Sequence, residues 1–588
     1  MLKRLFSFCC LSFCLAIYCE AIPVKSEWQL YVQPDGSEIS LLPVGDEYLH
    51  YFITTDSIPV IIEPDSDVAC YARISGGRLI STGIVAHEKG MRGQEDVQAI
   101  ADMPLPEQIG SVWRQRINDH QGNRINSLRP QRHQKGMALS FGDRRPTIGN
   151  KSGLIILVDF PNEKFTANHS SSFYNSMMNE EGYSDAQGHI GSVHDYFCAQ
   201  SYGLFTPTFD VIGPVTMLNR YEYYGTDDGE NIDVKMGELV VEACSAVDDE
   251  VDFSRYDWDD DGEVDQVFII YAGKGQATNP TNSSLIWPHM SSLMEMNGEK
   301  ITLDGVLIDT YACCNERYGS NNLSMGIGTI CHEFSHCLGL PDTYNTVLGT
   351  ASVAGIPGNY DLMASGNYNG PNGKGEVPAS LTAYGKYIAG WLDYKVLDGS
   401  QDVSRLASSL DSDDAYIIYN DACKDEYFVV ENRQKKSWDS YIPFPGLTLL
   451  HIDFDQMAWE NNEINGDNGF LRMSYVMSVE GYSPKYVFPY GSVKEVKESA
   501  MKLHNHNTDG TYLPHKSLTN IVQHADNTIS FHFENNNILS GIGNHDKECR
   551  GMIKYFNLSG MFVGNELPAK SGIYIAEKDN RIHKIVVK

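Results

Sequence analysis

The segment His332–Asp342 constrains this chain of 588 residues more than any other part of its sequence. It reads H-E-F-S-H-C-L-G-L-P-D, with two histidines four positions apart. On a helix, residues at this spacing project from the same face, so two imidazole nitrogens can reach one zinc ion at ~2.0–2.1 Å. Glu333 lies beside the first histidine without being a ligand, where it can accept a proton from a zinc-bound water.

The residues after the second histidine predict a third ligand. Gly339 favours the end of a helix because glycine readily adopts the left-handed backbone conformation found there, and Pro341 blocks further helix. The chain therefore turns, and Asp342 can return to the metal. Two neutral histidines and one carboxylate leave the zinc positive and with an open position. The alternative is a chance H-E-x-x-H on an ordinary amphipathic helix, which the glycine and the aspartate argue against.

A methionine follows the histidine helix at a suitable distance. Met363, in Asp361-Leu362-Met363-Ala364-Ser365-Gly366, suits the methionine turn that lies beneath the zinc in metzincins. There it would give the histidines an apolar, polarizable floor. Taken alone, one methionine is better explained by core packing, and its value lies in its place after the histidine helix. A thermolysin-type site needs instead a helical glutamate further along. The next glutamate is Glu376, in a loop-like stretch, which disfavours that site.

The start of the chain predicts export. Met1-Leu2-Lys3-Arg4 is basic, residues 5–18 are apolar, and small residues lead to Ala21. This is the pattern of a signal peptide spanning residues 1–21, too short to cross a membrane. No other segment is long and apolar enough for a span. We therefore expect a secreted, extracellular protein. A net charge of −32 argues against nucleic acid as a partner, because phosphates would be repelled.

Nine cysteines remain beyond the predicted signal peptide. Cys331 and Cys337 are too far apart on one helix to bond each other, but each can reach another segment. The neighbouring Cys313 and Cys314 are candidates for a disulfide that would fix the histidine helix. Buried free thiols are the equally favoured alternative, because connectivity cannot be deduced from spacing. Without a C-x-x-C pair, a cysteine-based zinc site is not expected.

Residues 22–147 are interpreted as a β-rich prodomain followed by a linker. Turn residues separate short alternating runs between 28 and 84, and residues 86–145 become polar and irregular. The alternative is a small β-domain without a regulatory role. A secreted zinc protease needs latency, which favours the prodomain. The thiolate of Cys70 and the carboxylate of Asp102 are alternative groups that could block the zinc.

The rest of the chain predicts three further regions. Buried-strand patterns at 154–161 and 267–273, with helices at 192–203 and 378–391, describe an α/β zincin domain, metzincin-like, over 148–400. Strand patterns at 427–431, 447–452 and 529–533 predict an all-β, sandwich-like domain over 401–535. Residues 536–588 read as a compact, hairpin-like tail. The predicted fold class is thus multidomain, α/β plus β.

An acidic loop precedes the second buried strand. Its oxygen ligands stand at alternate positions with Gly262 at the tight turn: Asp257, Asp259, Asp261, Glu263 and Asp265. Calcium takes six to eight such hard oxygens, so a structural calcium is expected. Phe268 stands where an EF-hand carries its last glutamate. The alternative is a solvated acidic loop.

Segments between about residues 150 and 535 resemble the immune inhibitor A-like family of secreted bacterial metallopeptidases. Besides the histidine motif, the similar runs are I-L-V-D-F-P at 156–161, G-S-V-H-D-Y-F at 191–197, Q-S-Y-G-L-F at 200–205, the acidic loop at 257–265, P-A-S-L-T-A-Y-G-K at 378–386, G-W-L at 390–392 and E-N-R at 431–433. The tail resembles the sorting or surface-associated segments of Bacteroidetes secreted proteins, which implies contact with secretion or surface-attachment machinery.

The resemblance implies a metzincin-type endopeptidase made as a secreted zymogen. It assigns zinc binding to His332, His336 and Asp342 and the general-base role to Glu333, and it favours calcium at the acidic loop. Metzincins often use a tyrosine near the methionine turn, for which Tyr360 and Tyr368 are both candidates.

We therefore predict a zinc-dependent endopeptidase that acts on proteins or peptides. The alternative is a secreted adhesion or binding protein whose zinc site is vestigial. The intact Glu333 argues against that alternative, because a degenerate site usually loses its base first.

Overall fold

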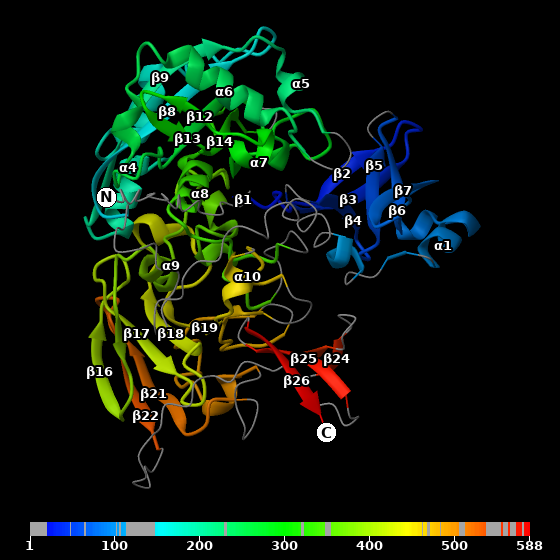
Figure 1. The fold of residues 1–588 in the computed structure, drawn as a ribbon. Coiled ribbons are helices and arrows are strands. Elements are labelled where there is room, and N and C mark those ends of the chain that lie inside the picture. The colour runs from blue at the N-terminus through cyan, green and yellow to red at the C-terminus, as the bar shows by residue number, and fades with distance from the viewer. Residues whose placement is uncertain are drawn as a thin grey trace, which may run out of the picture.

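The computed structural model describes residues 20–587 with gaps at 47–48, 64–65, 102, 105–107, 113–146, 228–231, 319–322, 347–353, 461, 467–470, 482–483, 505–511, 537–553, 557–561, 565–571 and 579–580. Within these residues the chain is rich in strands and has few helices (Figure 1). None of the described helices is long and apolar enough to cross a membrane. Residues 1–19 of the predicted signal peptide, Asp102 and most of the predicted linker lie outside the described residues.

The central sheet has six strands in the order β1-β11-β14-β10-β8-β9. Its strands are β1 (Glu20–Ala21), β8 (Gly149–Asp159), β9 (Phe205–Thr216), β10 (Val267–Lys274), β11 (His289–Ser292) and β14 (Thr310–Arg317). The strands β14, β10, β8 and β9 are parallel, whereas β11 runs antiparallel to β14. The inner strands β10 and β14 are almost wholly buried, as expected for a sheet covered on both faces.

Helices cover both faces of the central sheet (Figure 1). Alternate residues of β8 face opposite ways, so Ile155 and Leu157 join one hydrophobic core while Leu154 and Ile156 join the other. The first core contains α3 (Ser171–Asn179), α4 (Val193–Gln200) and α8 (Ile327–Cys337). The second contains α6 (Met236–Val247) and α5 (Tyr221–Tyr224). One face of the sheet therefore packs against α8.

The N-terminal part forms a separate antiparallel sheet of consecutive strands, drawn in blue in Figure 1. They are β2 (Gln29–Val32), β3 (Glu38–Gly45), β4 (His50–Thr54), β5 (Pro59–Glu63), β6 (Val68–Ser75) and β7 (Arg78–Val85). The helix α1 (Gln94–Ala101) follows, inside the region expected to be irregular. Asp96, in the first turn of α1, stabilises the start of the helix, because its carboxylate accepts a hydrogen bond from Gly93 N. The same carboxylate contacts His87 and Tyr71.

The second half of the chain contains a five-stranded and a three-stranded sheet. The first comprises β15 (Tyr394–Val396), β17 (Ala415–Tyr419), β18 (Glu426–Arg433), β19 (Gly446–Asp453) and β20 (Met473–Tyr475). The second comprises β16 (Gln401–Leu406), β21 (Lys516–Gln523) and β22 (Ile529–Asn535). Phe428 of the first and Phe531 of the second share one core, so the two sheets pack together. Further along, β23 (Lys554–Phe556), β24 (Phe562–Gly564), β25 (Gly572–Lys578) and β26 (Arg581–Val587) form a four-stranded sheet.

Two expectations from the sequence need correction. The helix predicted over 378–391 is shorter: α9 spans Ala383–Ile388 and begins at the Thr382 cap. The preceding residues are extended because Ser380 N and Leu381 N donate to the side chains of Asp439 and Gln200.

The disulfide alternative for the histidine helix is also wrong. None of these four cysteines is in a disulfide: Cys313, Cys314, Cys331 and Cys337. Cys313 faces the core opposite to α8, because adjacent residues of a strand point to opposite sides. Elsewhere, Cys423 is disulfide-bonded.

Candidate active site

The end of α8 has the geometry that the glycine predicted. Gly339 has φ +85°, Leu340 N donates to Ser335 O at 3.1 Å, and Gly339 N donates to His336 O at 2.8 Å. This pair of hydrogen bonds is a Schellman motif, which satisfies carbonyl groups of the last helical turn and reverses the chain. The reversal brings Asp342 back over the face of the helix that carries the two histidines.

The predicted ligands converge. His332, His336 and Asp342 each place a ligand atom within 4.8 Å of the others. The two Nε2 atoms are 3.1 Å apart, and Asp342 Oδ1 lies 3.2 Å and 3.6 Å from them. Two ligand atoms of a tetrahedral zinc, each ~2.0–2.1 Å from the metal, lie about 3.3 Å apart. Asp342 Oδ1 is buried and makes no hydrogen bond. A buried carboxylate oxygen facing two imidazole nitrogens fits a zinc ion.

Backbone carbonyls orient both imidazoles. His332 Nδ1 is 2.8 Å from Leu362 O, and His336 Nδ1 is 2.7 Å from Leu340 O. If Nδ1 donates in each ring, Nε2 presents its lone pair to a metal. Burial lowers the pKa of His332, which favours the neutral ring that metal binding requires. Met363 is buried in the same core as α8, beside the carbonyl that holds His332.

The third ligand is held by a residue far away in the sequence. Asp342 N donates to Asn462 Oδ1, and Asn462 Nδ2 donates to Asp342 Oδ2, both at 2.7 Å. These bonds leave Oδ1 pointing toward the histidines. Asn462 was not identified from the sequence, and no local pattern around it signals the contact.

Glu333 is shielded from solvent. Its exposed fraction is 0%, and its Oε1 accepts a hydrogen bond from the backbone nitrogen of Ile22 at 3.1 Å. The segment from Ile22 onward therefore covers the candidate base. This contact joins residues 311 positions apart, and no sequence pattern predicts it.

The two candidate tyrosines have different hydrogen-bond partners. Tyr368 Oη donates to Pro23 O at 3.1 Å, in the same segment that covers Glu333. Tyr360 Oη instead contacts the backbone of Phe444, donating to its carbonyl at 3.1 Å. Of the two, Tyr368 is the one placed near the catalytic residues. Glu376 is buried in its loop and does not belong to the ligand cluster.

Of the two candidate blocking groups, Cys70 does not explain the covered base. Cys70 is buried in β6, where it pairs with Ile61 and Val85 of the N-terminal sheet, and burial raises the pKa of its thiol. A thiolate block by Cys70 would require that strand to leave its sheet. The other candidate, Asp102, lies outside the described residues.

The acidic loop brings three of its five predicted ligands together. Asp257, Asp259 and Asp261 place ligand oxygens within 4.8 Å of one another. Glu263 forms an ion pair with Lys300 at 2.6 Å. Asp265 accepts a hydrogen bond from Trp258 N, and burial raises the pKa of its carboxyl group to about 7. Calcium at this loop thus stays a prediction that three of the carboxylates favour.

A buried ion pair fastens the catalytic region to the second half of the chain. Arg433, fully buried on β18, donates to both carboxylate oxygens of Asp439 at 2.7 Å and 2.8 Å. Asp439 Oδ1 also accepts from Ser380 N at 3.0 Å. The E-N-R run and the P-A-S-L-T run meet here, because Arg433 also donates to Ser380 O, 53 positions away in the sequence.

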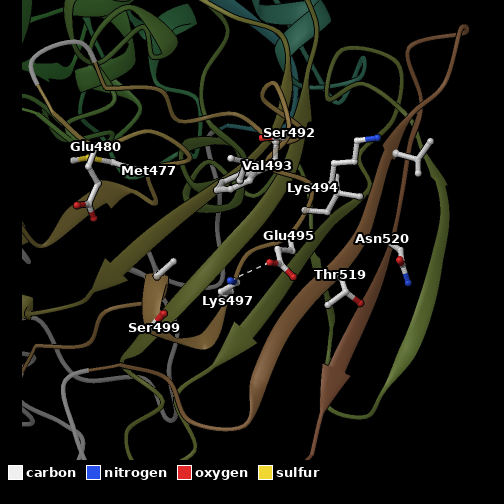
Figure 2. A pocket seen from close by; sticks show the side chains of 14 residues that line it. Met477, Glu480, Ser492, Val493, Lys494, Glu495, Lys497, Ser499, Thr519 and Asn520 are labelled. Atoms are coloured by element: carbon white, nitrogen blue, oxygen red, sulfur yellow. Dashed lines mark ion pairs between the residues drawn. The ribbon is translucent and has the colours of Figure 1, made fainter.

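A surface hollow in the second half is separate from these residues. Its lining includes Met477, Val493, Lys494, Thr519 and the ion pair between Lys497 and Glu495 at 3.2 Å (Figure 2). None of the histidine-motif residues lines it. Its chemistry offers no metal ligand cluster, so the candidate active site is the one on α8.

Part of the chain is similar to known peptidases. Residues 150–393 match the model of the immune inhibitor A peptidase M6 catalytic domain. The chain is 26% identical over 287 residues to the pre-pro-metalloprotease PrtV of Vibrio cholerae serotype O1, covering 42% of this chain and 30% of that protein. It is 23% identical over 284 residues to a "Putative secreted metallopeptidase" of Arthroderma benhamiae, covering 39% of each chain.

The matched region thus spans less than half the length of either relative. The matched residues include α8, the three candidate ligands and the turn containing Met363. Residues 150–393 of this chain are therefore similar to the catalytic domain of the immune inhibitor A peptidases.

Proposed function

We propose that this chain is a secreted zinc-dependent endopeptidase made as a zymogen. The observation that carries the proposal is the convergence of His332, His336 and Asp342, with the buried Asp342 Oδ1 making no hydrogen bond. Glu333 follows the first ligand on the same helix. Three ligands with an adjacent carboxylate are the set that a hydrolytic zinc site requires. The central sheet, helix and methionine turn suit a metzincin-like zincin.

The chain's own residues supply the proton transfers. Zinc held by the three ligands would polarise the scissile carbonyl and lower the pKa of a water molecule at the open position. Glu333 accepts a proton from the attacking water and delivers it to the leaving amine. Its Oε1 already lies 3.1 Å from a backbone nitrogen, that of Ile22, which is a suitable distance for such a transfer. Tyr368 is placed to donate to a backbone carbonyl of the bound peptide.

The other predicted parts belong to the same proposal. Residues 1–21 act as the signal peptide, 22–147 as prodomain and linker, 148–400 as catalytic domain, 401–535 as β-sandwich-like domain and 536–588 as a tail for secretion or surface attachment. The buried Glu333 supports latency, because a base with an exposed fraction of 0% cannot meet a substrate. Calcium at the acidic loop would be structural.

Casein cleavage by the purified, activated protein tests the proposal. Activity should be lost in Glu333→Ala and in His336→Ala, while the matched Glu181→Ala, at an exposed position, should keep it. Zinc content measured by mass spectrometry should be one equivalent lower in His336→Ala and unchanged in Glu333→Ala. Equal activity in Glu333→Ala and wild type would reject the proposal and favour an adhesion or binding role with a vestigial site.

A further inference from the structure

The N-terminal segment Ile22–Lys25 is bound along the candidate active site by its backbone. Trp287 Nε1 donates to Ile22 O at 3.1 Å, Tyr368 Oη donates to Pro23 O at 3.1 Å, and Lys25 N donates to Ala277 O at 3.1 Å. Just before it, β1 forms the terminal strand of the central sheet by pairing antiparallel with β11, and it lies beside α8 (Figure 1). An extended peptide added to a sheet edge is a common mode of peptide recognition.

The position of the Ile22 nitrogen gives the segment its register. A general base that protonates the leaving amine must lie about 2.6–3.2 Å from that nitrogen. The Ile22 nitrogen lies 3.1 Å from Glu333 Oε1. The bond between Ala21 and Ile22 therefore stands where a scissile bond would stand, and Ile22 corresponds to the first residue after the cleaved bond.

The side chains of the segment occupy an apolar site. Ile22 and Val24 are 0% and 2% exposed and pack in one cluster with Ala277, Trp287 and Tyr368. We call these last three residues the Trp287 cluster. Removing these branched aliphatic side chains from water favours the bound position of the segment. Lys25 adds a polar anchor, because its Nζ donates to Gly373 O at 2.9 Å.

We propose that Ile22–Lys25 is a built-in, product-like occupant of the substrate site, and that the Trp287 cluster is the subsite for the residue that follows the cleaved bond. The proposal rests on the peptidase function proposed above. The preferred substrates are extended peptides with a branched aliphatic residue at that position. The same segment keeps Glu333 from substrate until it is displaced.

Placing a charge on the segment tests whether Ile22–Lys25 occupies the substrate site. Aspartate at position 22 would enter the apolar site beside Glu333, so Ile22→Asp should expel the segment and raise cleavage of a fluorogenic peptide by the full-length protein roughly tenfold or more. The matched control is Val32→Asp, at a position 58% exposed on β2, which should behave as wild type. N-terminal sequencing of all three proteins checks that they begin at the same residue.

Three outcomes separate this inference from the proposed function. If Ile22→Asp gains activity and the added Glu333→Gln removes it, both hold. If the wild-type full-length protein is already as active as Ile22→Asp, the built-in occupant is rejected while the peptidase function holds. If no protein is active even after limited proteolysis, the peptidase function itself fails.

A free peptide tests the register without altering the fold. The hexapeptide of residues 22–27, Ile-Pro-Val-Lys-Ser-Glu, should inhibit the activated protein competitively, and the same peptide beginning with aspartate should inhibit at least roughly tenfold more weakly. Substrate-library profiling completes the test. Ala277→Phe, which fills the Trp287 cluster, should shift the preference from isoleucine and valine to glycine and alanine. Unchanged profiles would reject the subsite assignment.

A second inference rests on an independent group of residues in the second half of the chain. Glu426, His451 and His504 place ligand atoms within 4.8 Å of one another. His451 Nε2 is 2.9 Å from Glu426 Oε1. The two rings meet edge to face with centroids 4.7 Å apart, the same separation as those of His332 and His336.

The surroundings of this group also suit a metal. Asp453 Oδ2 lies 3.0 Å from His504 Nδ1, as the outer carboxylate does behind a metal-bound histidine. Glu426 and Asp453 are buried at 0% and 1% exposure; Asn420 Nδ2 donates to Glu426 Oε2 at 3.2 Å, and Arg472 Nη1 lies 3.5 Å from Asp453 Oδ2. A bound cation would add to this compensation of two buried negative charges.

We infer that Glu426, His451 and His504 form a second transition-metal site, with zinc as the metal that this donor set favours. Zinc per chain, measured by mass spectrometry after dialysis, should be two for wild type and one for His451→Phe, His504→Asn and His332→Ala. One zinc per wild-type chain, with the same value in His451→Phe and His504→Asn, would reject the site. The exposed His515→Asn is the control.

Discussion

The side-chain amide of Asn462 forms two hydrogen bonds of 2.7 Å with Asp342, which lies 120 positions earlier in the sequence. It accepts one from the backbone nitrogen of Asp342 and donates the other to the carboxylate of Asp342. The third candidate zinc ligand is therefore oriented from outside the segment that matches the family. Groups that orient metal ligands typically change metal affinity when they are removed.

Replacing Asn462 by alanine should weaken zinc binding about 10- to 100-fold, because Asp342 loses the contacts that direct its Oδ1 to the histidines. Competition with a chromogenic chelator measures the affinity. Asn175→Ala, at an exposed position on α3, provides the control. An affinity equal to that of wild type would mean that the turn after α8 alone holds Asp342.

Gly339→Ala should lower stability by about 1–2 kcal/mol, because its φ of +85° is costly for a residue with a Cβ atom. Strain at this turn should also reduce zinc affinity, since His336 and Asp342 flank it. Thermal melting with and without zinc measures both effects. Gly399→Ala, where the added methyl group meets nothing within 4 Å, should leave the melting temperature unchanged or raise it.

Asp439→Asn should destabilise the protein by about 3–5 kcal/mol, because it leaves the guanidinium of Arg433 buried without its main counter-charge. The exposed pair of Lys436 and Asp411 offers the comparison: Asp411→Asn should cost less than about 1 kcal/mol. Urea denaturation followed by fluorescence gives both values. Similar losses in the two variants would contradict the structural role of the buried pair.

His289 should make stability depend on pH. Burial lowers the pKa of its imidazole from 6.5 to about 4, with Trp287 O, Tyr311 Oη, Cys313 and Asp233 around the ring. Between these pH values the unfolded chain binds a proton that the folded chain does not. Stability should therefore fall as the pH drops from about 6.5 to about 4, by up to roughly 3 kcal/mol.

The His289→Gln variant isolates this contribution, because glutamine does not titrate. Its melting temperature should decline less steeply than that of wild type over the same pH range. Exposed His515→Gln should follow the wild-type curve. Parallel curves for wild type and His289→Gln would show that the acid sensitivity arises elsewhere.

Calcium should stabilise the acidic loop. Adding calcium to chelator-treated protein should raise the melting temperature of wild type, because the ion neutralises the carboxylates of Asp257, Asp259 and Asp261. Asp259→Asn should reduce this increase, and exposed Asp249→Asn should not. A calcium response of the same size in Asp259→Asn would favour the solvated loop.

Short sequence patterns predicted those features of the site that are set by residues close together in the sequence. Helical spacing placed His332 and His336 on one face, and Gly339 ended the helix where the chain had to turn back. Buried-strand patterns placed β8 and β10 within a few residues of their observed bounds. Each of these inferences uses interactions between residues fewer than about ten positions apart.

The unpredicted parts depend on contacts between distant segments. No sequence pattern around Asn462 or Ile22 predicts which residue each one contacts. An asparagine in a loop and an isoleucine after a signal sequence are compatible with many environments. The disulfide alternative failed for a related reason. A disulfide needs a narrow range of Cα separation and direction, which the packing of a helix on a sheet does not generally provide.

The attachment of Ile22–Lys25 to the rest of the chain sets the local concentration of this segment. A tethered ligand faces its site at an effective concentration on the order of millimolar, so even a hexapeptide with weak intrinsic affinity keeps the site filled. Cutting the tether leaves the contacts of the segment unchanged but lets it dilute into the surroundings. Activation then requires only one cleavage in the connecting chain, followed by diffusion, with no rearrangement of the catalytic residues.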